Sequence, residues 1–214
     1  MAEPSAERPK ISFERVRSSI DDSGAAVDSI LDAADKLHDG INTDHLTGLS
    51  NLAGLELGLR TIVEKRIDEH SRVAIVFIDL DKFKDINDTF GYNAGDEALT
   101  KFADMLRDLF KRKEDLLSVV SRWGGDEFVL CIPYDEIHSG KDRRTQADVS
   151  SVVEQSIRDR LNIALQSGEL PDFMVGMTAT VGAEIFDSQD LKGDLGDFLQ
   201  KAKDKVQDRK RDRQ

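Results

Sequence analysis

The sequence predicts an α+β fold in which helices pack on a mostly antiparallel sheet. The apolar run Val73–Ile78 predicts a strand buried on both faces. Apolar runs at 117–120 and 128–132 flank Gly124-Gly125 and predict a β-hairpin. Alternation over 175–185 predicts another, half-buried strand. With helical patterns between them, the elements follow the order helix, strand, helix, hairpin, helix, strand, helix, which indicates a sheet layered with helices.

Composition places the chain among soluble globular proteins. It has 214 residues, of which 39% are hydrophobic and 34% charged, enough for one domain and an extension. A net charge of −12 argues against nucleic-acid or anionic-membrane partners. No run is long enough to span a bilayer and no signal peptide is evident, so we expect a cytoplasmic location. The single cysteine, Cys131, lies in an apolar strand pattern and is expected to be a reduced core residue.

The N-terminal part predicts a tail and a helix. Residues 1–11 are polar with two prolines and are expected to be disordered. Residues 12–41 carry a narrow stripe with alternating steps of three and four, typical of a coiled coil. The alternative is an amphipathic helix packed on its own domain, which usually shows a wider stripe. We favour a dimerisation and signalling helix that forms a homodimer through 13–41, with residues 42–214 as the main domain. The stripe comprises Phe13, Val16, Ile20, Ser23, Val27, Ile30, Ala34, Leu37 and Ile41.

Apolar residues at helical spacing predict four further helices. The first runs from Leu52 to about His70, after a turn at 47–50. The second begins near Gly95-Asp96 and continues to Phe110. A polar surface loop at 135–146 precedes the third, at 146–166, and the fourth spans about 194–211.

Acidic residues follow two of the predicted strands. Asp79 ends the first strand, and Asp126 and Glu127 end the hairpin turn. Burying a carboxylate beside an apolar run is costly unless a cation or hydrogen bonds compensate. If the strand lies beside the hairpin, Asp79 and Asp126 can share a hard cation such as Mg²⁺. The alternative is that Asp79 caps a turn and the hairpin acids are solvated turn residues.

The segment after Asp79 carries groups suited to a nucleotide. A helix N-terminus within 81–87 would present backbone N–H groups to a triphosphate, and Lys84 would add a point charge. Asn87 offers a donor and an acceptor, and Asp96 offers acceptors, which suits the edge of guanine. For Asp96 the alternative is an acid placed near the positive end of a helix dipole.

These motifs, taken in order, resemble the GGDEF family of diguanylate cyclases. They are Asp44–Asn51, Asp79–Asp88, Gly91 with Gly95-Asp96, and Gly124–Phe128. The resemblance extends from about Asp44 to at least Gly182. It implies a ferredoxin-like fold similar to the palm of nucleotide cyclases and polymerases.

The resemblance also implies an activity and a set of roles. Members condense two GTP molecules into cyclic di-GMP and pyrophosphate as Mg²⁺-dependent homodimers in bacterial second-messenger signalling. Two Mg²⁺ ions per GTP are expected, with Mn²⁺ as an alternative. Asp79, Asp126 and the Leu80 carbonyl would be metal ligands, Glu127 a further ligand or the base, and Asp126 and Glu127 the catalytic pair. Asn87 and Asp96 would bind guanine. The phosphate-binding residues would be Lys82, Phe83, Lys84, Gly124, Gly125 and Lys210.

The C-terminal motif departs from the family pattern. Relatives carry Ala-Leu-Tyr-x-Ala-Lys followed by Gly-Arg-Asn, whereas this chain has Phe198–Lys203 and then scattered basic residues. Lys210 is therefore assigned as the phosphate-binding lysine. This departure supports an alternative, a catalytically inactive GGDEF domain that binds GTP or cyclic di-GMP as a signalling module. The intact acids Asp79, Asp126 and Glu127 argue against that alternative.

Overall fold

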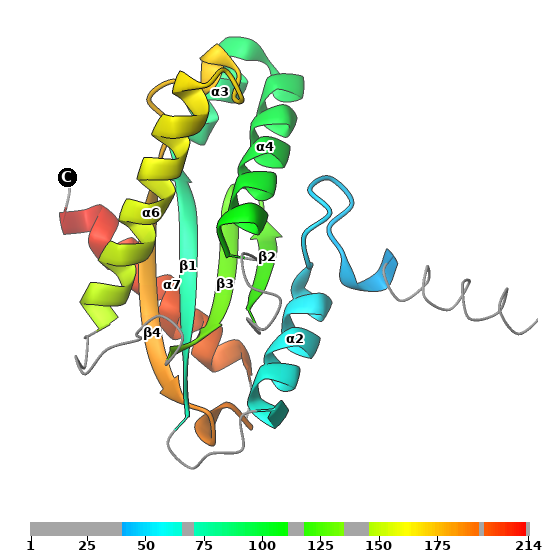
Figure 1. Cartoon of the computed structure of the whole chain (residues 1–214), viewed down its shortest axis with the longest axis vertical. Helices are drawn as coiled ribbons and strands as arrows, with labels where there is room; N and C mark the ends of the chain where they lie inside the picture. The colour runs from blue at the N-terminus through cyan, green and yellow to red at the C-terminus, as the bar shows by residue number, and fades with distance from the viewer. Residues whose placement is uncertain (1–39, 66–70, 111–117, 135–145, 193–194, 213–214) are drawn as a thin grey trace, which may run out of the picture. The chain divides into compact units, whose positions relative to one another are not determined.

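The computed structural model describes residues 40–65, 71–110, 118–134, 146–192 and 195–212 (Figure 1). The chain divides into two compact units, 1–41 and 42–214. The predicted tail at 1–11, and the predicted dimerisation helix up to residue 39, lie outside the described residues. Among the helices that the structure describes, none combines the length and apolar character needed to cross a membrane.

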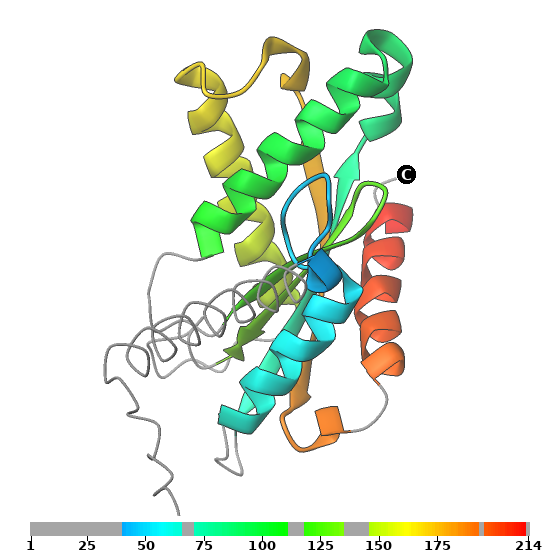
Figure 2. The ribbon, with the colours of Figure 1, turned by 90° about the vertical axis from the view of Figure 1, so that its right-hand side faces the viewer.

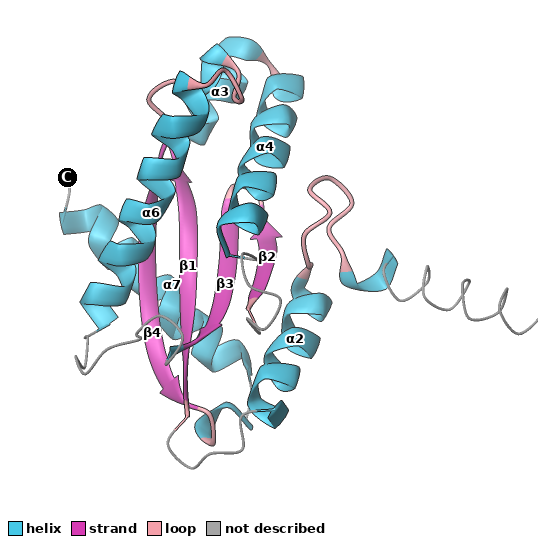
Figure 3. Cartoon of the chain, viewed as in Figure 1, coloured by secondary structure: helices cyan, strands magenta, loops and turns pink. Residues whose placement is uncertain are grey.

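The second unit is built on a four-stranded sheet with strand order β2-β3-β1-β4, in which every neighbouring pair is antiparallel. This order and the connecting helices give ferredoxin-like topology, with one helix added before it and one after it. The predicted α+β class is therefore confirmed (Figure 3). The elements are α2 (Leu52–Lys65), β1 (Arg72–Asp81), α3 (Phe83–Phe90), α4 (Tyr92–Phe110), β2 (Val119–Gly124), β3 (Glu127–Pro133), α6 (Gln146–Gln166), η1 (Asp172–Met174), β4 (Thr178–Asp187), η2 (Asp190–Lys192) and α7 (Leu195–Asp212).

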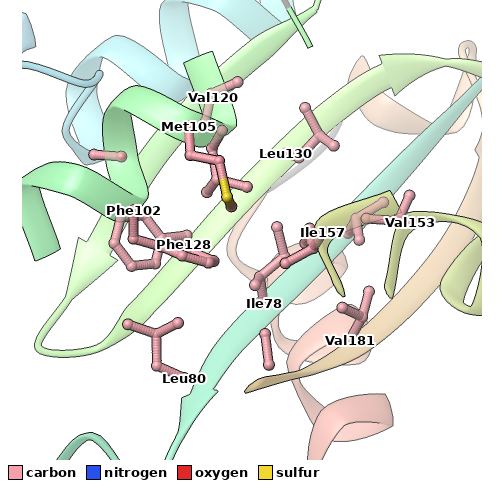
Figure 4. Close-up of a cluster of buried hydrophobic side chains, with 14 of the residues drawn as sticks. Ile78, Leu80, Phe102, Met105, Val120, Phe128, Leu130, Val153, Ile157 and Val181 are labelled. Carbon is pink, nitrogen blue, oxygen red and sulfur yellow. The ribbon is translucent and has the colours of Figure 1, made fainter. Parts of the chain in front are cut away.

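Strand β1 is apolar on both faces because a helical layer covers each of them (Figure 2). Successive side chains of a strand point to opposite faces. Ile78 and Leu80 pack in one cluster with residues of α4, β3 and α6 (Figure 4). In that cluster the rings of Phe102 and Phe128 lie 5.1 Å apart. This layer fixes β1 against β3.

The other face of the sheet packs against α2 and α7. Phe77 of β1 shares this second cluster with Leu59 of α2 and Leu199 of α7. Cys131 is also buried there, and burial raises the pKa of its thiol to about 12. The thiol therefore stays protonated near neutral pH, which agrees with the predicted core role. Gly182 of β4 lies opposite Phe77 and lets α7 approach the sheet closely.

A loop at 43–51 covers the outer edge of β2. Ser50 N–H donates to the Val120 carbonyl at 3.3 Å, and the Arg122 N–H donates to the Ser50 carbonyl at 2.9 Å. Ser121 Oγ donates to the same Ser50 carbonyl at 2.8 Å. On its other side the loop is held by Arg107 of α4, which donates to the Thr47 carbonyl at 2.9 Å. An edge that would otherwise be open to pairing is thus closed.

The boundaries of β1 and α4 differ from the sequence predictions. β1 continues to Asp81, so Asp79 does not end the strand. β1 continues because β4 remains paired with it as far as Thr178. α4 begins at Tyr92 rather than at Gly95-Asp96. A separate short helix, α3, ends at Phe90, and the turn at Gly91 that follows it sets the start of α4.

Strand β4 was predicted to be half-buried, and this prediction is wrong. Most of its residues are buried, because α6 and α7 cover its two faces. The strand also begins later than predicted, at Thr178. Val175, which was assigned to it, follows η1 and is 70% exposed. The alternation of small and apolar residues in the sequence did not indicate that helices cover both faces of this strand.

Candidate functional site

The two acidic segments meet at one end of the sheet. Asp79 of β1 lies directly opposite Glu127, the first residue of β3. Side chains of directly opposed residues share one face, so both carboxylates lie on the face that α7 covers. Asp126 precedes Glu127, and its carbonyl accepts a 3.2 Å hydrogen bond from the Leu80 N–H. The predicted neighbourhood of strand and hairpin is therefore present.

The hairpin turn falls one residue later than predicted. β2 ends at Gly124 and β3 begins at Glu127, so Gly125 and Asp126 form the turn. Gly125 has φ +56°, which residues with side chains seldom adopt. A Cβ added to Gly124 or Gly125 would meet nothing within 4 Å, so the backbone is open to a ligand. The shift follows an irregularity in register between Arg122 and Gly124.

Two lysines of α7 contact the acids. Lys203 Nζ donates to Glu127 Oε2 at 2.7 Å, and Lys210 Nζ pairs with Asp79 Oδ1. Lys210 was predicted to bind phosphate, and that role stays a prediction. Lys203 was missed by the sequence reasoning. The signal that could have found it is the spacing of seven from Lys210, which places both lysines on one helix face.

An ion pair between helices holds the end of α7 that carries Lys210. Arg209 donates to Glu154 Oε2 of α6 at 2.7 Å, and Arg158 donates to Glu154 Oε1 at 3.1 Å. The Glu154 side chain is only 8% exposed. Because α6 and α7 lie on opposite faces of the sheet, this pair joins the two layers. It also fixes the backbone next to Lys210.

Asp79 lies in an unfavourable electrostatic setting. Burial raises the pKa of this carboxyl group, and the negative charges of Asp126 and Glu127 raise it further. Lys210 acts in the opposite direction but does not restore the ordinary pKa. A gathering of acids of this kind is stabilised by additional positive charge. Such perturbed groups are frequent at functional sites.

Asp81, although close in sequence, has a different role. Its carboxylate accepts hydrogen bonds from Thr178 Oγ1 and Thr180 Oγ1, both at 2.7 Å. These bonds fasten the end of β1 to β4. Asp79 therefore belongs to the acidic site, whereas Asp81 joins two strands.

The predicted phosphate segment follows the end of β1 directly (Figure 1). Lys82 adopts a left-handed conformation with φ 59° and makes no side-chain cap hydrogen bond at the start of α3. The first N–H groups of α3 therefore lack a capping side chain, which suits an anion. Lys82 and Lys84 are exposed, and Phe83 packs against the core. The arrangement fits the predicted role of Lys82, Phe83 and Lys84.

The predicted guanine-binding residues lie on neighbouring helices. Asn87 belongs to α3 and is half-buried, whereas Asp96 belongs to α4 and is exposed. Gly95 is the point of close approach, since a Cβ added there would overlap Asn87 Oδ1. Asn87 therefore lies against α4 immediately before Asp96. Whether the pair reads guanine stays a prediction.

Arg122 connects the hairpin to the loop at 43–51, and the sequence reasoning gave it no role. Its guanidinium donates to Asp44 Oδ1 at 3.1 Å and to the Gly125 carbonyl at 2.9 Å. Asp44 also accepts bonds from the Thr47 N–H at 2.9 Å and the Thr47 hydroxyl at 2.7 Å. The signal in the sequence that could have found this contact is an arginine just before Trp123-Gly124, together with Asp44 in a distant motif. Arg122 positions the turn that carries Asp126.

The donor set suits a hard divalent cation. Carboxylate oxygens of Asp79, Asp126 and Glu127 are ligands that Mg²⁺ and Mn²⁺ accept. Within the described ranges, no three His, Cys, Asp or Glu side chains lie close enough together to hold an ion as they stand. Asp79 and Glu127 instead contact lysines, which supply the positive charge that a cation would supply. The residues fit a cation once these pairs open.

The fold and site together define a ferredoxin-like α+β domain with an acidic centre on a glycine turn. The family model described as "Diguanylate cyclase, GGDEF domain" matches residues 41–214. The chain therefore belongs to the GGDEF domain family of diguanylate cyclases.

Curated relatives share part of the chain. The probable diguanylate cyclase DgcE of Escherichia coli K12 is 39% identical over 98 residues, which are 46% of this chain and 8% of DgcE. Diguanylate cyclase DgcP of the same organism is 36% identical over 124 residues, which are 56% of this chain and 33% of DgcP. The matched region thus spans a third or less of these relatives.

Solved structures confirm the fold. Diguanylate cyclase SiaD of Pseudomonas aeruginosa, solved with its activator SiaC, has a TM-score of 0.61 and 25% identity, and the match covers 94% of this chain and 70% of SiaD. The coiled coil and GGDEF domain of DgcB from Caulobacter crescentus, solved with c-di-GMP, has a TM-score of 0.63 and 18% identity, and the match covers 92% and 94% of the two chains.

Proposed function

We propose that this protein condenses two GTP molecules into cyclic di-GMP with release of pyrophosphate. The observation that carries the proposal is the pairing of Asp79 with Glu127 beside the Gly125-Asp126 turn. Members of the same family that share 36% identity with part of this chain are diguanylate cyclases. A purely structural role would leave this costly gathering of acids unexplained.

The proposed mechanism divides the work among three groups of residues. Asp79, Asp126 and Glu127, with the Leu80 carbonyl, would hold the divalent cation. When bound, that cation would supply positive charge that lowers the pKa of the attacking 3′-hydroxyl and stabilises the leaving pyrophosphate. Glu127 is the residue proposed to accept the hydroxyl proton.

The other two groups bind the nucleotide. The uncapped start of α3 and Lys84 would hold the phosphates, and the exposed Gly124 would let the backbone approach them. Asn87 and Asp96 would hold the guanine edge by hydrogen bonds. Orientation of the 3′-hydroxyl toward phosphorus is the main contribution expected from these contacts.

The product requires two such domains. Cyclic di-GMP is two-fold symmetric and each domain would hold one GTP, so a two-fold homodimer is the simplest arrangement. The predicted helix at 13–41 would raise the effective concentration of one domain near the other. Its dimerisation is a sequence-based proposal.

The direct test is product analysis with a matched pair of variants. Purified protein is incubated with GTP and Mg²⁺, and the nucleotides are separated. We expect cyclic di-GMP from the wild type and from Asp88→Ala, an exposed acid of α3, and none from Asp126→Ala. Removal of Mg²⁺ by EDTA should also stop synthesis. Nucleotide binding that needs Asn87, without any product, would favour the inactive signalling module.

A further inference from the structure

We propose that Lys203 and Lys210 are resident counterions of the acidic site, and that a divalent cation binds only by displacing them. The inference rests on the proposed function to the extent that it takes Asp79 and Glu127 as cation ligands. It adds an exchange step between two side chains of α7 and the incoming ion.

The pairs are made one to one. Lys203 Nζ lies 2.7 Å from Glu127 Oε2, and Lys210 Nζ contacts Asp79 Oδ1. Asp79 is more enclosed than its partner, since its side chain is 18% exposed and that of Lys210 is 37% exposed, whereas Glu127 and Lys203 are equally enclosed, at 23% and 24%. A carboxylate oxygen that accepts from an ammonium group offers fewer lone pairs to a metal. Cation binding therefore competes with both pairs.

The exchange needs movement of side chains alone. The Lys210 side chain is 37% exposed and the Lys203 side chain 24%, so both have access to water. Lysine has a flexible four-carbon stem that can redirect its ammonium group. The α7 backbone stays in place because Arg209 is paired with Glu154 and because Val206 packs on the sheet.

Displacement has a consequence for substrate binding. Two ammonium groups released from the acids would remain beside the site, on the face of α7 that borders it. A cation that arrives with a polyphosphate would replace the two ammonium groups at the carboxylates. The released ammonium groups would then face the negative charge of the polyphosphate. A cation that arrives alone must also separate the two ion pairs, but the released ammonium groups then have no phosphate charge to contact.

Trp123 gives an intrinsic probe of the exchange at Lys203. It is the single tryptophan of the chain. Lys203 Nζ lies 5.8 Å from the centroid of its ring, within the range of a cation–π interaction. Release of Lys203 from Glu127 changes the charge near the indole. Nucleotide-free protein titrated with Mg²⁺ should show a saturable change in Trp123 emission that is lost in Lys203→Met.

Direct binding of Mn²⁺ tests the exchange at Lys210. Free Mn²⁺ is measured by electron paramagnetic resonance in nucleotide-free protein. We expect Lys210→Met to bind Mn²⁺ about three- to tenfold more tightly than the wild type. Lys101→Met, an exposed lysine of α4, removes the same charge away from the acids and should leave the affinity nearly unchanged. Lys210→Gln serves as a second variant, and thermal unfolding in EDTA verifies that each variant is folded.

Three results would overturn the inference. One is a Lys210→Met affinity for Mn²⁺ no higher than that of Lys101→Met. Another is wild-type Trp123 emission that stays constant when Mg²⁺ is added to metal-free protein, over the concentrations at which Mg²⁺ competes with Mn²⁺ for binding. The third is the absence of Mn²⁺ binding in the wild type and in every lysine variant. Tighter Mn²⁺ binding by Lys210→Met without cyclic di-GMP synthesis by the wild type would instead refute only the proposed function.

Discussion

Gly182 of β4 lies directly beneath the backbone of α7, where an added Cβ would stand 2.5 Å from the amide nitrogen of Val206. The same Cβ would lie 2.8 Å from the Lys205 carbonyl carbon. Backbone atoms cannot move aside as a flexible side chain can. The absence of a side chain at Gly182 therefore sets how closely the helix that carries Lys203 and Lys210 approaches the acids.

The first prediction concerns Gly182→Ala. The added methyl group should push α7 from the sheet and lower the free energy of unfolding by about 1–3 kcal/mol. Urea unfolding followed by circular dichroism measures this loss. Gly40→Ala is the matched control, because a Cβ there meets nothing within 4 Å. Equal stability of the two variants would contradict the close packing of α7.

The second prediction concerns the pH dependence of stability at Asp44. Burial alone would raise the pKa of this carboxyl group, but hydrogen bonds from Thr47 and Arg122 outweigh it and hold the pKa below its ordinary value of 3.8. An acid with a lowered pKa contributes stability that is present above its unfolded pKa and lost as pH falls through its folded pKa. The contribution is therefore complete near neutral pH and disappears in acid.

Asp44→Asn should accordingly lower the free energy of unfolding by about 1–2 kcal/mol near neutral pH, because the ionic part of these bonds is lost. The deficit relative to the wild type should shrink as the pH falls below about 4. Urea unfolding at several pH values measures both effects. Asp104→Asn, at an exposed pair with Arg107, is the control and should cost little. A deficit that persists unchanged in acid would show that charge is not the cause.

The third prediction concerns Gly95→Ala. The new Cβ would overlap Asn87 Oδ1 and turn that side chain away, whereas alanine itself favours the helix. We expect normal stability with about tenfold weaker GTP binding, measured by calorimetry. Asn87→Ala should weaken binding to a similar extent. The double variant should show no further loss, since both changes remove one interaction. Additive losses would indicate that Gly95 acts independently of Asn87.

The fourth prediction concerns the N-terminal helix expected from the sequence. Val27→Asp places a charge in the apolar seam, so it should weaken dimerisation and reduce synthesis at low protein concentration. Sedimentation velocity and turnover measured across a dilution series test both effects. Ser29→Asp adds the same charge off the seam and should behave like the wild type. Unchanged turnover of Val27→Asp at high dilution would refute the role of this segment.

Much of the fold could be predicted because its signals are local. The apolar run at 73–78 indicates a buried strand, and the hairpin glycines indicate a turn. Each signal lies within a few consecutive residues. Helical spacing placed α6 and α7 close to their observed bounds. The acids Asp79, Asp126 and Glu127 were likewise singled out from their positions beside apolar runs, although β1 continues past Asp79. Patterns of two and 3.6 residues are properties of the chain before any long-range contact forms.

The remainder depended on residues far apart in the sequence. Lys210 and Asp79 are separated by 131 positions, and no local pattern indicates that they pair. Asp81 resembles Asp79 in sequence, and only its contacts with β4 assign it to joining strands.

The sequence by itself thus determined where most of the strands, the longer helices and the acidic turn lie, to within a few residues, because short-range periodicity encodes burial. The tertiary structure alone decided that Lys203 and Lys210 contact the acids, and it set the distances of these contacts. That outcome depends on the docking of α7 at Gly182 and on its ion pair with Glu154, both set by the packing of two layers on one sheet.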